Sequence, residues 1–165
     1  MFGHLGFSYV GLIFLLLVFI PNFFWNRHRP VEYETDFESG IFLLLERIGQ
    51  VGCTISALMF SDFNFAPFTP WTLWLILAFA VMALYEFCWI RYFRSRMREI
   101  NMYRSFCGIP VPLAVFPTAA FLLLGLYGKV VWLVLFAAVF GVGHIGLQLQ
   151  HREKCREEAR RRLGK

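Results

Sequence analysis

Ionisable and amide side chains interrupt several apolar runs of this sequence, and their types are those used in acid–base and ligand-binding chemistry. The run IFLLLERIGQVGCTISALMF, residues 41–60, contains Glu46, Arg47 and Gln50. Two later apolar runs contain Glu86 and His144. In a low-dielectric environment, carboxylates and imidazoles acquire shifted proton affinities, and an arginine beside them can hold an anionic group. These residues are therefore the first candidates for a functional site.

The surrounding sequence is that of an integral membrane protein. Of its 165 residues, 58% are hydrophobic and only 16% are charged, whereas about a quarter of the residues of a soluble domain are charged. A helix of about 20 residues rises about 30 Å, the thickness of a hydrocarbon core. Apolar runs of this length occur at about residues 5–24, 41–60, 71–90, 109–127 and 130–149. The predicted fold is all-α, a bundle of five transmembrane helices formed by residues 1–150 as a single domain.

The first apolar run could be read as a signal peptide. It lacks a basic segment before it and a small-residue cleavage site after it, so we expect a helix of the mature protein.

The distribution of lysine and arginine predicts the orientation of this bundle. The connections 25–40 and 91–108 carry two and five arginines, and the segment 151–165 carries seven basic residues. The connection 61–70 carries none, and the turn at Gly128 carries only Lys129. Because cytoplasmic loops retain Lys and Arg, we expect the N-terminus outside and the C-terminus in the cytoplasm. The expected location is the plasma (inner) membrane.

Two segments of this cytoplasmic side have a pattern of their own. In the loop 91–108, the spacing of Phe93, Met97, Ile100 and Tyr103 predicts a short helix lying in the membrane interface. The basic tail 151–165 has no aromatic residues to stack on bases, so we expect it to contact anionic membrane lipids rather than nucleic acid.

The loop between the first two helices is acidic. Glu32, Glu34, Asp36 and Glu38 alternate with other residues in PVEYETDFESG. A period of two favours an extended segment over a helix. The loop could cover the cytoplasmic mouth of the bundle by facing the arginines of 91–108, or it could simply be a solvated acidic loop.

With this orientation, the intramembrane polar groups fall in one layer, the cytoplasmic half of the bundle. Arg47 points about 100° away from Glu46 around the helix, so Glu86 is its first candidate partner. The predicted pocket consists of Glu46, Arg47, Gln50, Glu86, Trp89, His144 and Gln148, with Asn22, Asn26 and His151 at its rim. The alternative is a buried network without a cavity, which only fastens the helices together.

Small residues and prolines predict how the helices pack around this layer. Gly49 and Gly52 on the second helix, and Gly143 and Gly146 on the fifth, favour close approach between helices. Pro117 lies inside the fourth helix and is expected to kink it. The cysteines have no metal-binding spacing, so we expect free thiols. His144 and His151 are two helical turns apart, too far to share one ion, and the sequence has no nucleotide- or dinucleotide-binding motif, so we expect no metal and no cofactor.

Three functions could use this pocket. The first is binding or transport of a small, partly apolar ligand, with proton coupling through Glu46 or Glu86. The second is an integral-membrane enzyme in which His144 and a glutamate act as acid and base on a lipid-like substrate. The third is a structural or assembly subunit. Five helices cannot form two equal halves, so a carrier is expected to form a homodimer.

Overall fold

The protein is all-helical in the computed structural model, which describes residues 3–30 and 33–163. Its long helices are α1 (Tyr9–Arg27), α2 (Gly40–Met59), α3 (Leu73–Phe93), α5 (Pro112–Gly128) and α6 (Val131–Leu163). Short elements are the 3-10 turns η1 (Ser61–Phe63) and η2 (Pro70–Thr72) and the one-turn helix α4 (Glu99–Met102). Four of the described helices, α1, α2, α3 and α6, are long and apolar enough to cross a membrane, and α5 is a shorter apolar helix. This is the architecture of a multi-pass membrane protein.

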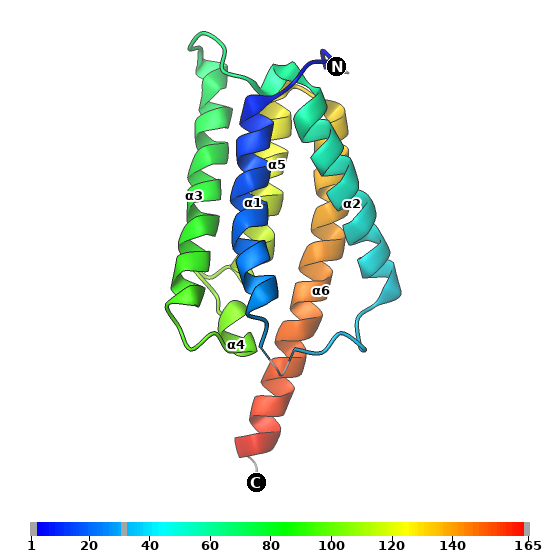
Figure 1. Ribbon diagram of the computed structural model, residues 1–165, viewed down its shortest axis with the longest axis vertical. Coiled ribbons are helices and arrows are strands. Elements are labelled where there is room, and N and C mark those ends of the chain that lie inside the picture. The colour runs from blue at the N-terminus through cyan, green and yellow to red at the C-terminus, as the bar shows by residue number, and fades with distance from the viewer. Residues whose placement is uncertain (1–2, 31–32, 164–165) are drawn as a thin grey trace.

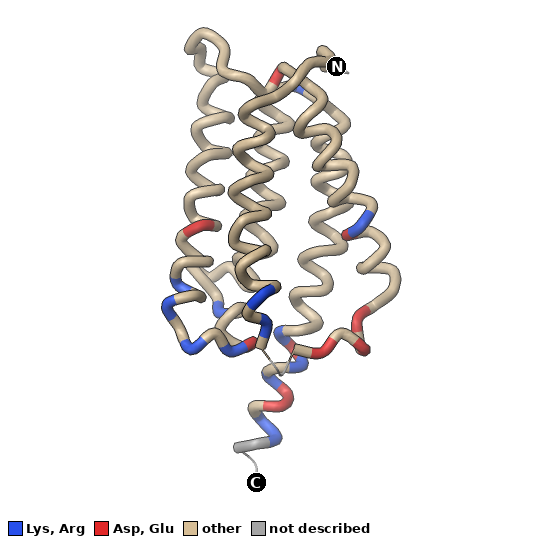
Figure 2. Tube along the Cα trace, in the orientation of Figure 1, with Lys and Arg blue, Asp and Glu red and all other residues tan. Residues whose placement is uncertain are grey.

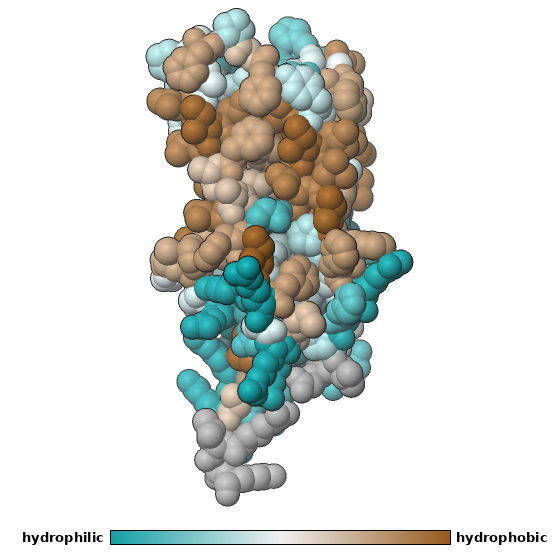
Figure 3. All heavy atoms as spheres, turned by 60° about the vertical axis from the view of Figure 1, so that its left-hand side comes forward, coloured by the Kyte–Doolittle hydropathy of each residue, from teal (hydrophilic) through white to brown (hydrophobic). Residues whose placement is uncertain are grey.

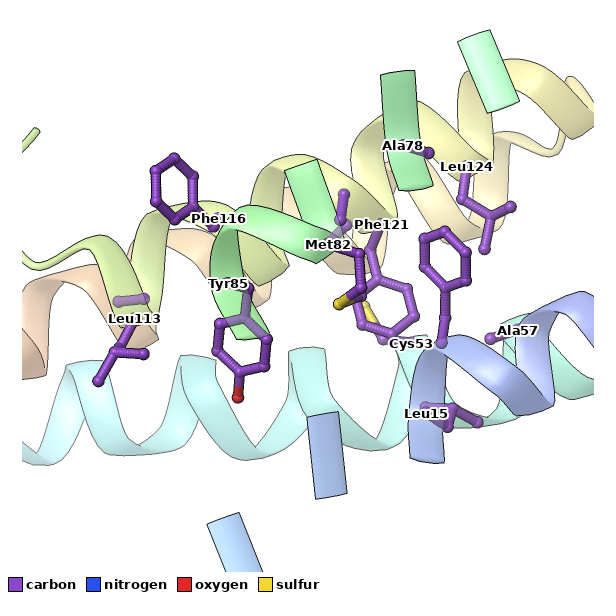
Figure 4. Packing of buried hydrophobic residues seen from close by; sticks show 14 of the residues in the cluster. Leu15, Cys53, Ala57, Ala78, Met82, Tyr85, Leu113, Phe116, Phe121 and Leu124 are labelled. Atoms are coloured by element: carbon purple, nitrogen blue, oxygen red, sulfur yellow. The ribbon is translucent and has the colours of Figure 1, made fainter. Parts of the chain in front are cut away.

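The long helices form an elongated bundle in which α1 stands between α2 and α3 (Figure 1). The most extensive packing joins α2 to α6, followed by α3 to α5 and α5 to α6. By contrast, α1 packs only lightly against α2 and α3. The interior is apolar, as Figure 4 shows for Leu15, Cys53, Met82 and Phe121. The side chains on the face seen in Figure 3 are apolar over most of its height and hydrophilic at its lower end.

Glycine allows the close contact between α2 and α6. A Cβ on Gly143 of α6 would overlap the backbone nitrogen of Glu46 on α2. A Cβ on Gly49 of α2 would overlap the backbone of Phe140 on α6. Close backbone approach through small residues is a common way for helices to associate in lipid, where the apolar environment supplies no hydrophobic driving force. The contact also fixes Glu46 next to the residue after Gly143, which is His144.

One end of the bundle, here called the N-terminal end, is closed by pairing of the chain segments 3–8 and 59–64. Gly6 donates a backbone hydrogen bond to Met59, and Ser61 donates one to His4. The His4 imidazole lies 2.8 Å from the Asp62 carboxylate. Asn64 accepts a hydrogen bond from the Tyr9 backbone and donates one to Phe7. These bonds satisfy backbone groups at the start of α1 that would otherwise be unpaired.

The opposite end, here called the basic end, carries most of the charged residues (Figure 2). Within 91–108, α3 continues to Phe93, and the one helical turn that follows is α4, so the spacing of Phe93, Met97, Ile100 and Tyr103 does not correspond to one continuous helix. The Ser95 hydroxyl accepts a hydrogen bond from the Met97 backbone and donates one to Tyr92. Met97 has a positive φ of 46°. This turn folds the chain back toward α6, so Glu99 and Tyr103 become buried rather than lying flat at a membrane surface.

The last helix differs from the predicted 130–149 because α6 continues without a break to Leu163. Most residues of this extension are strong helix formers, namely Arg, Glu, Lys and Ala. Several acidic and basic side chains are also spaced three or four residues apart, which stabilises a solvated helix. As far as residue 163, the expected basic tail is therefore part of α6, projecting beyond the rest of the bundle (Figure 1).

We expect Gly143→Ala to destabilise the protein because the new methyl group overlaps the backbone of α2. The expected loss is about 1–3 kcal/mol, or several degrees in Tm, measured by thermal unfolding of the purified protein in detergent. Gly40→Ala is the matched control, since no atom lies within 4 Å of a Cβ at that position. Equal Tm values for the two variants would contradict the proposed role of the α2–α6 contact.

Candidate functional site

The candidate site is centred on a contact between α2 and α6. Nδ1 of His144 lies 2.5 Å from Oε1 of Glu46. The two side chains are 20% and 22% exposed, so neither is sealed in the core. A carboxylate bonded to one imidazole nitrogen fixes the orientation of the ring and leaves the other nitrogen for a third group. The ring of His144 is further held by stacking on Phe140, with the centroids 4.8 Å apart.

A second polar pair comes from α1 and α3. Nδ2 of Asn22 donates hydrogen bonds of 2.8 Å to both the Val18 carbonyl and the Tyr85 hydroxyl. With its amide hydrogens engaged, Asn22 offers its carbonyl oxygen as an acceptor, and Tyr85 offers its hydroxyl hydrogen as a donor. Figure 4 shows the Tyr85 ring extending from α3 into the bundle, with the hydroxyl at its far end.

These two pairs line the same cavity, whose volume is about 170 Å³. All five long helices contribute to its wall. The lining residues are Val18, Phe19, Asn22, Glu46, Gln50, Tyr85, Pro117, Phe140 and His144. A volume of this size holds several water molecules or a small organic group. The cavity therefore presents a carboxylate, an imidazole, two amides and a phenol to whatever occupies it.

An apolar chamber of about 40 Å³ adjoins this cavity on the side of the N-terminal end. The chamber adds Leu15, Cys53, Thr54 and Phe121 to five residues that line both spaces. Phe19 and Gln50 belong to that shared wall and are exposed at the surface. Together the two spaces form one groove, here called the α1/α2 groove, with a polar end and an apolar end. It is partly open to the surroundings of the bundle.

The structure brings together four of the residues predicted for the pocket and its rim, which are Asn22, Glu46, Gln50 and His144. The others lie elsewhere. Trp89 is buried against Tyr85 and Phe93. Gln148 is half-buried outside the cavity, and Asn26 is exposed and accepts a hydrogen bond from Arg29. Pro117 lies inside α5 and contributes to the groove wall.

The predicted pairing of Arg47 with Glu86 does not occur within the chain. Arg47 is exposed on α2, whereas Glu86 lies on α3 beside a separate apolar groove. The two helices stand on opposite sides of α1 (Figure 1). Helical spacing predicts the direction of each side chain around its own helix, but not which helices are neighbours.

His151 is the centre of a second polar cluster rather than part of the cavity rim. Its side chain is 1% exposed, with Nε2 at 2.9 Å from Glu38 and Nδ1 at 3.1 Å from Glu99. Tyr33 stacks on the imidazole at a centroid distance of 4.8 Å. This His151 cluster joins the acidic loop and α4 to α6. Within residues 3–30 and 33–161, however, no three His, Cys, Asp or Glu side chains converge closely enough to hold a metal ion.

The acidic loop is held against α6 by the His151 cluster and by a neighbouring ion pair. Glu34 forms an ion pair of 2.6 Å with Lys154, and this hydrogen bond lowers the pKa of Glu34. Burial, followed by the neighbouring Glu38 carboxylate, raises the pKa of Tyr33 to about 12, so its phenol stays neutral. The loop thus lies across the basic end, where Glu38 and Glu34 pair with His151 and Lys154 of α6 rather than with the arginines of 91–108. Glu32 lies outside the described residues.

Comparison with known proteins identifies no relative. No protein family, curated protein or solved structure matches the chain.

A double-mutant cycle should reveal the coupling between Glu46 and His144. We expect the unfolding free energies of Glu46→Gln and His144→Gln to be non-additive by about 0.5–3 kcal/mol, as for residues in direct contact. Thermal unfolding of the single and double variants provides the measurement. Arg47→Gln combined with His144→Gln is the control pair, and its effects should add. Additive effects in both pairs would show that the Glu46–His144 contact does not hold the site together.

Proposed function

We propose that this protein binds a small amphipathic molecule in the α1/α2 groove and moves it within or across the membrane. The observation that carries the proposal is the composition of the groove, in which one end is polar and the other apolar. Glu46, His144, Asn22 and Tyr85 would hold a polar head, while Leu15, Cys53 and Phe121 would receive an apolar chain. Pockets for small ligands commonly combine an apolar wall with a few placed polar groups.

The position of the groove supports access from the lipid phase. It lies beside α1, which packs lightly on its neighbours, and exposed Phe19 and Gln50 are part of its wall. The N-terminal end is closed by the pairing of 3–8 with 59–64. A lipid-like ligand would therefore reach the site sideways, between helices, rather than through a pore along the bundle axis.

The Glu46–His144 contact supports proton coupling in this proposal. A carboxylate paired with a protonated imidazole is neutral overall, whereas a carboxylate paired with a neutral imidazole carries one negative charge. A ligand that hydrogen-bonds to either group changes the proton affinity of the pair, and by reciprocity the proton changes ligand affinity. A proton-coupled carrier needs such a linkage.

An integral-membrane enzyme is the second candidate, and the same contact favours it. An imidazole oriented by a carboxylate can act as a general base or acid toward a group placed in the cavity. The two candidates differ in the fate of the bound molecule, which a carrier releases unchanged and an enzyme converts.

The proposed orientation places the basic end in the cytoplasm and the N-terminus outside, with five membrane-spanning helices in the plasma (inner) membrane. The concentration of arginines at one end of the bundle supports it (Figure 2). The groove's polar end then lies in the cytoplasmic half of the membrane.

Native mass spectrometry of the purified protein tests ligand binding. We expect a small amphipathic molecule to co-purify with the unmodified protein and to be reduced about tenfold or more in Glu46→Gln, since hydrogen bonds to charged groups contribute about 1.5–3 kcal/mol. Val18→Trp, which fills the shared wall of the groove, should have the same effect. The matched controls are Glu86→Gln and Leu16→Trp, which alter a carboxylate and an aliphatic residue outside the groove.

Equal retention of the molecule in all four variants would refute binding in the groove. Its chemical conversion by the purified protein would favour the enzyme over the carrier.

The native Cys107 provides a direct probe of orientation. Cys107 is exposed at the basic end, whereas Cys53 and Cys88 are buried and Cys155 is half-buried. We expect a membrane-impermeant maleimide to label Cys107 in inside-out vesicles but not in intact cells. Cys107→Ser should abolish most of the labelling. Efficient labelling of Cys107 in intact cells would mean that the orientation is the reverse.

A further inference from the structure

Two charged side chains in the membrane-crossing helices have no partner within the described chain. Arg47 is exposed on α2 and forms no ion pair or hydrogen bond there with another described residue. Oε1 of Glu86 on α3 is buried and has no hydrogen-bond partner. Charged groups in a membrane usually pair with one another or face a polar cavity. This pair of residues does neither within one copy of the protein.

The neighbouring groups that could neutralise them are engaged elsewhere. Glu46, next to Arg47, is bonded to His144. The guanidinium of Arg91, the basic residue of α3, donates hydrogen bonds to the backbone carbonyls of Arg104 and Ser105. It also lies over the ring of Phe106. Arg47 and Glu86 are therefore left as complementary charges of opposite sign.

Both residues lie at the same depth. Arg47 follows the first residue of α2, Gly40, by seven positions, and Glu86 precedes the last residue of α3, Phe93, by seven positions. Both helix ends are at the basic end of the bundle, so each charge is about 10 Å inside it. Figure 2 shows the charged segment of α2 and the acidic segment of α3 at similar heights on opposite sides of the bundle.

We propose that Arg47 of one copy pairs with Glu86 of the next copy, joining identical chains side by side in the membrane. Copies inserted in the same orientation bring equal depths together, so the two charges meet without tilting either bundle. An arginine can bind a carboxylate through two parallel hydrogen bonds. The inference does not depend on what the α1/α2 groove binds.

The surfaces around the two charges fit this contact. Glu86 borders a groove of about 330 Å³ between α1 and α3, whose wall is otherwise apolar and includes Leu17, Phe79 and Ile90. On the other side, Leu44, Ile48 and Val51 flank Arg47 and are 59%, 47% and 59% exposed. An arginine inserted into the groove would meet the side chain of Glu86 in its wall, while the aliphatic neighbours of Arg47 cover the rest of the groove.

The position of the charges determines the type of assembly. In a two-fold dimer, the same face of each copy would have to carry both Arg47 and Glu86, so that two Arg47–Glu86 pairs form across one interface. These two residues lie on opposite sides of the bundle instead. The contact is therefore heterologous, and repetition of it gives a closed ring or an open row.

Charge reversal tests the pairing. Arg47→Glu and Glu86→Arg each place like charges at the contact, so we expect each variant alone to be monomeric in the membrane. Two differently tagged chains, one with each substitution, should associate when co-expressed, since every contact between unlike copies again joins opposite charges. Arg94→Glu, which reverses a charge at the exposed basic end, is the control and should associate as the unmodified chain does. Association of the single variants, or failure of the mixed pair, would overturn the proposal.

Crosslinking in membranes provides a test that leaves both charges in place. Leu44→Cys and Ile90→Cys in one chain, with Cys107 and Cys155 changed to serine, put thiols at similar depths on the two faces. Mild oxidation should yield a ladder of dimers, trimers and larger species, reduced about tenfold or more by adding Glu86→Arg. Dimers without larger species, a ladder insensitive to Glu86→Arg, or monomers throughout would show that the contact is not the one proposed.

Discussion

The close backbone contact between α2 and α6 is the constraint on which the rest of this structure depends. A helix pair in lipid gains stability from packing, and packing improves as the backbones approach. Gly49 and Gly143 permit this approach, and each leaves no room for even a methyl group. As a result Glu46 and His144 meet across the contact, while α1, held more loosely, leaves the α1/α2 groove beside them. The tightly packed α2–α6 pair thus positions Glu46 and His144, whereas the loosely packed α1 borders the groove.

The polar residues of α6 serve two environments because they lie at different depths. His144 is within the bundle and borders the cavity, while His151 follows two turns later and is covered by the acidic loop and α4. In the His151 cluster both imidazole nitrogens have a carboxylate partner, which favours a fixed arrangement. In the cavity the polar groups keep unused donors and acceptors. Unused donors and acceptors are what recognition of a ligand requires, so the cavity suits binding and the His151 cluster does not.

Much of this architecture is present in the sequence, but the interactions between helices are not. Runs of about 20 apolar residues predict membrane-crossing helices because length and hydropathy alone determine whether a segment can span lipid. The glycines of α2 and α6 indicate close packing, although not which helices make it. Arg47 and Glu86 are an example, because the sequence gives their depths and charges but does not show that α1 lies between their two helices. The burial of Glu99 could not be predicted from the sequence of the basic loop, because it arises from the turn at Met97.

The unbroken length of α6 has a mechanical consequence. The same rigid rod carries His144 at the groove and, beyond the bundle, the charged residues from Arg152 to Arg161. A continuous helix transmits an axial shift or rotation along its whole length without a hinge to absorb it. Any axial shift or rotation of α6 at the groove would therefore also move these charged residues beyond the bundle.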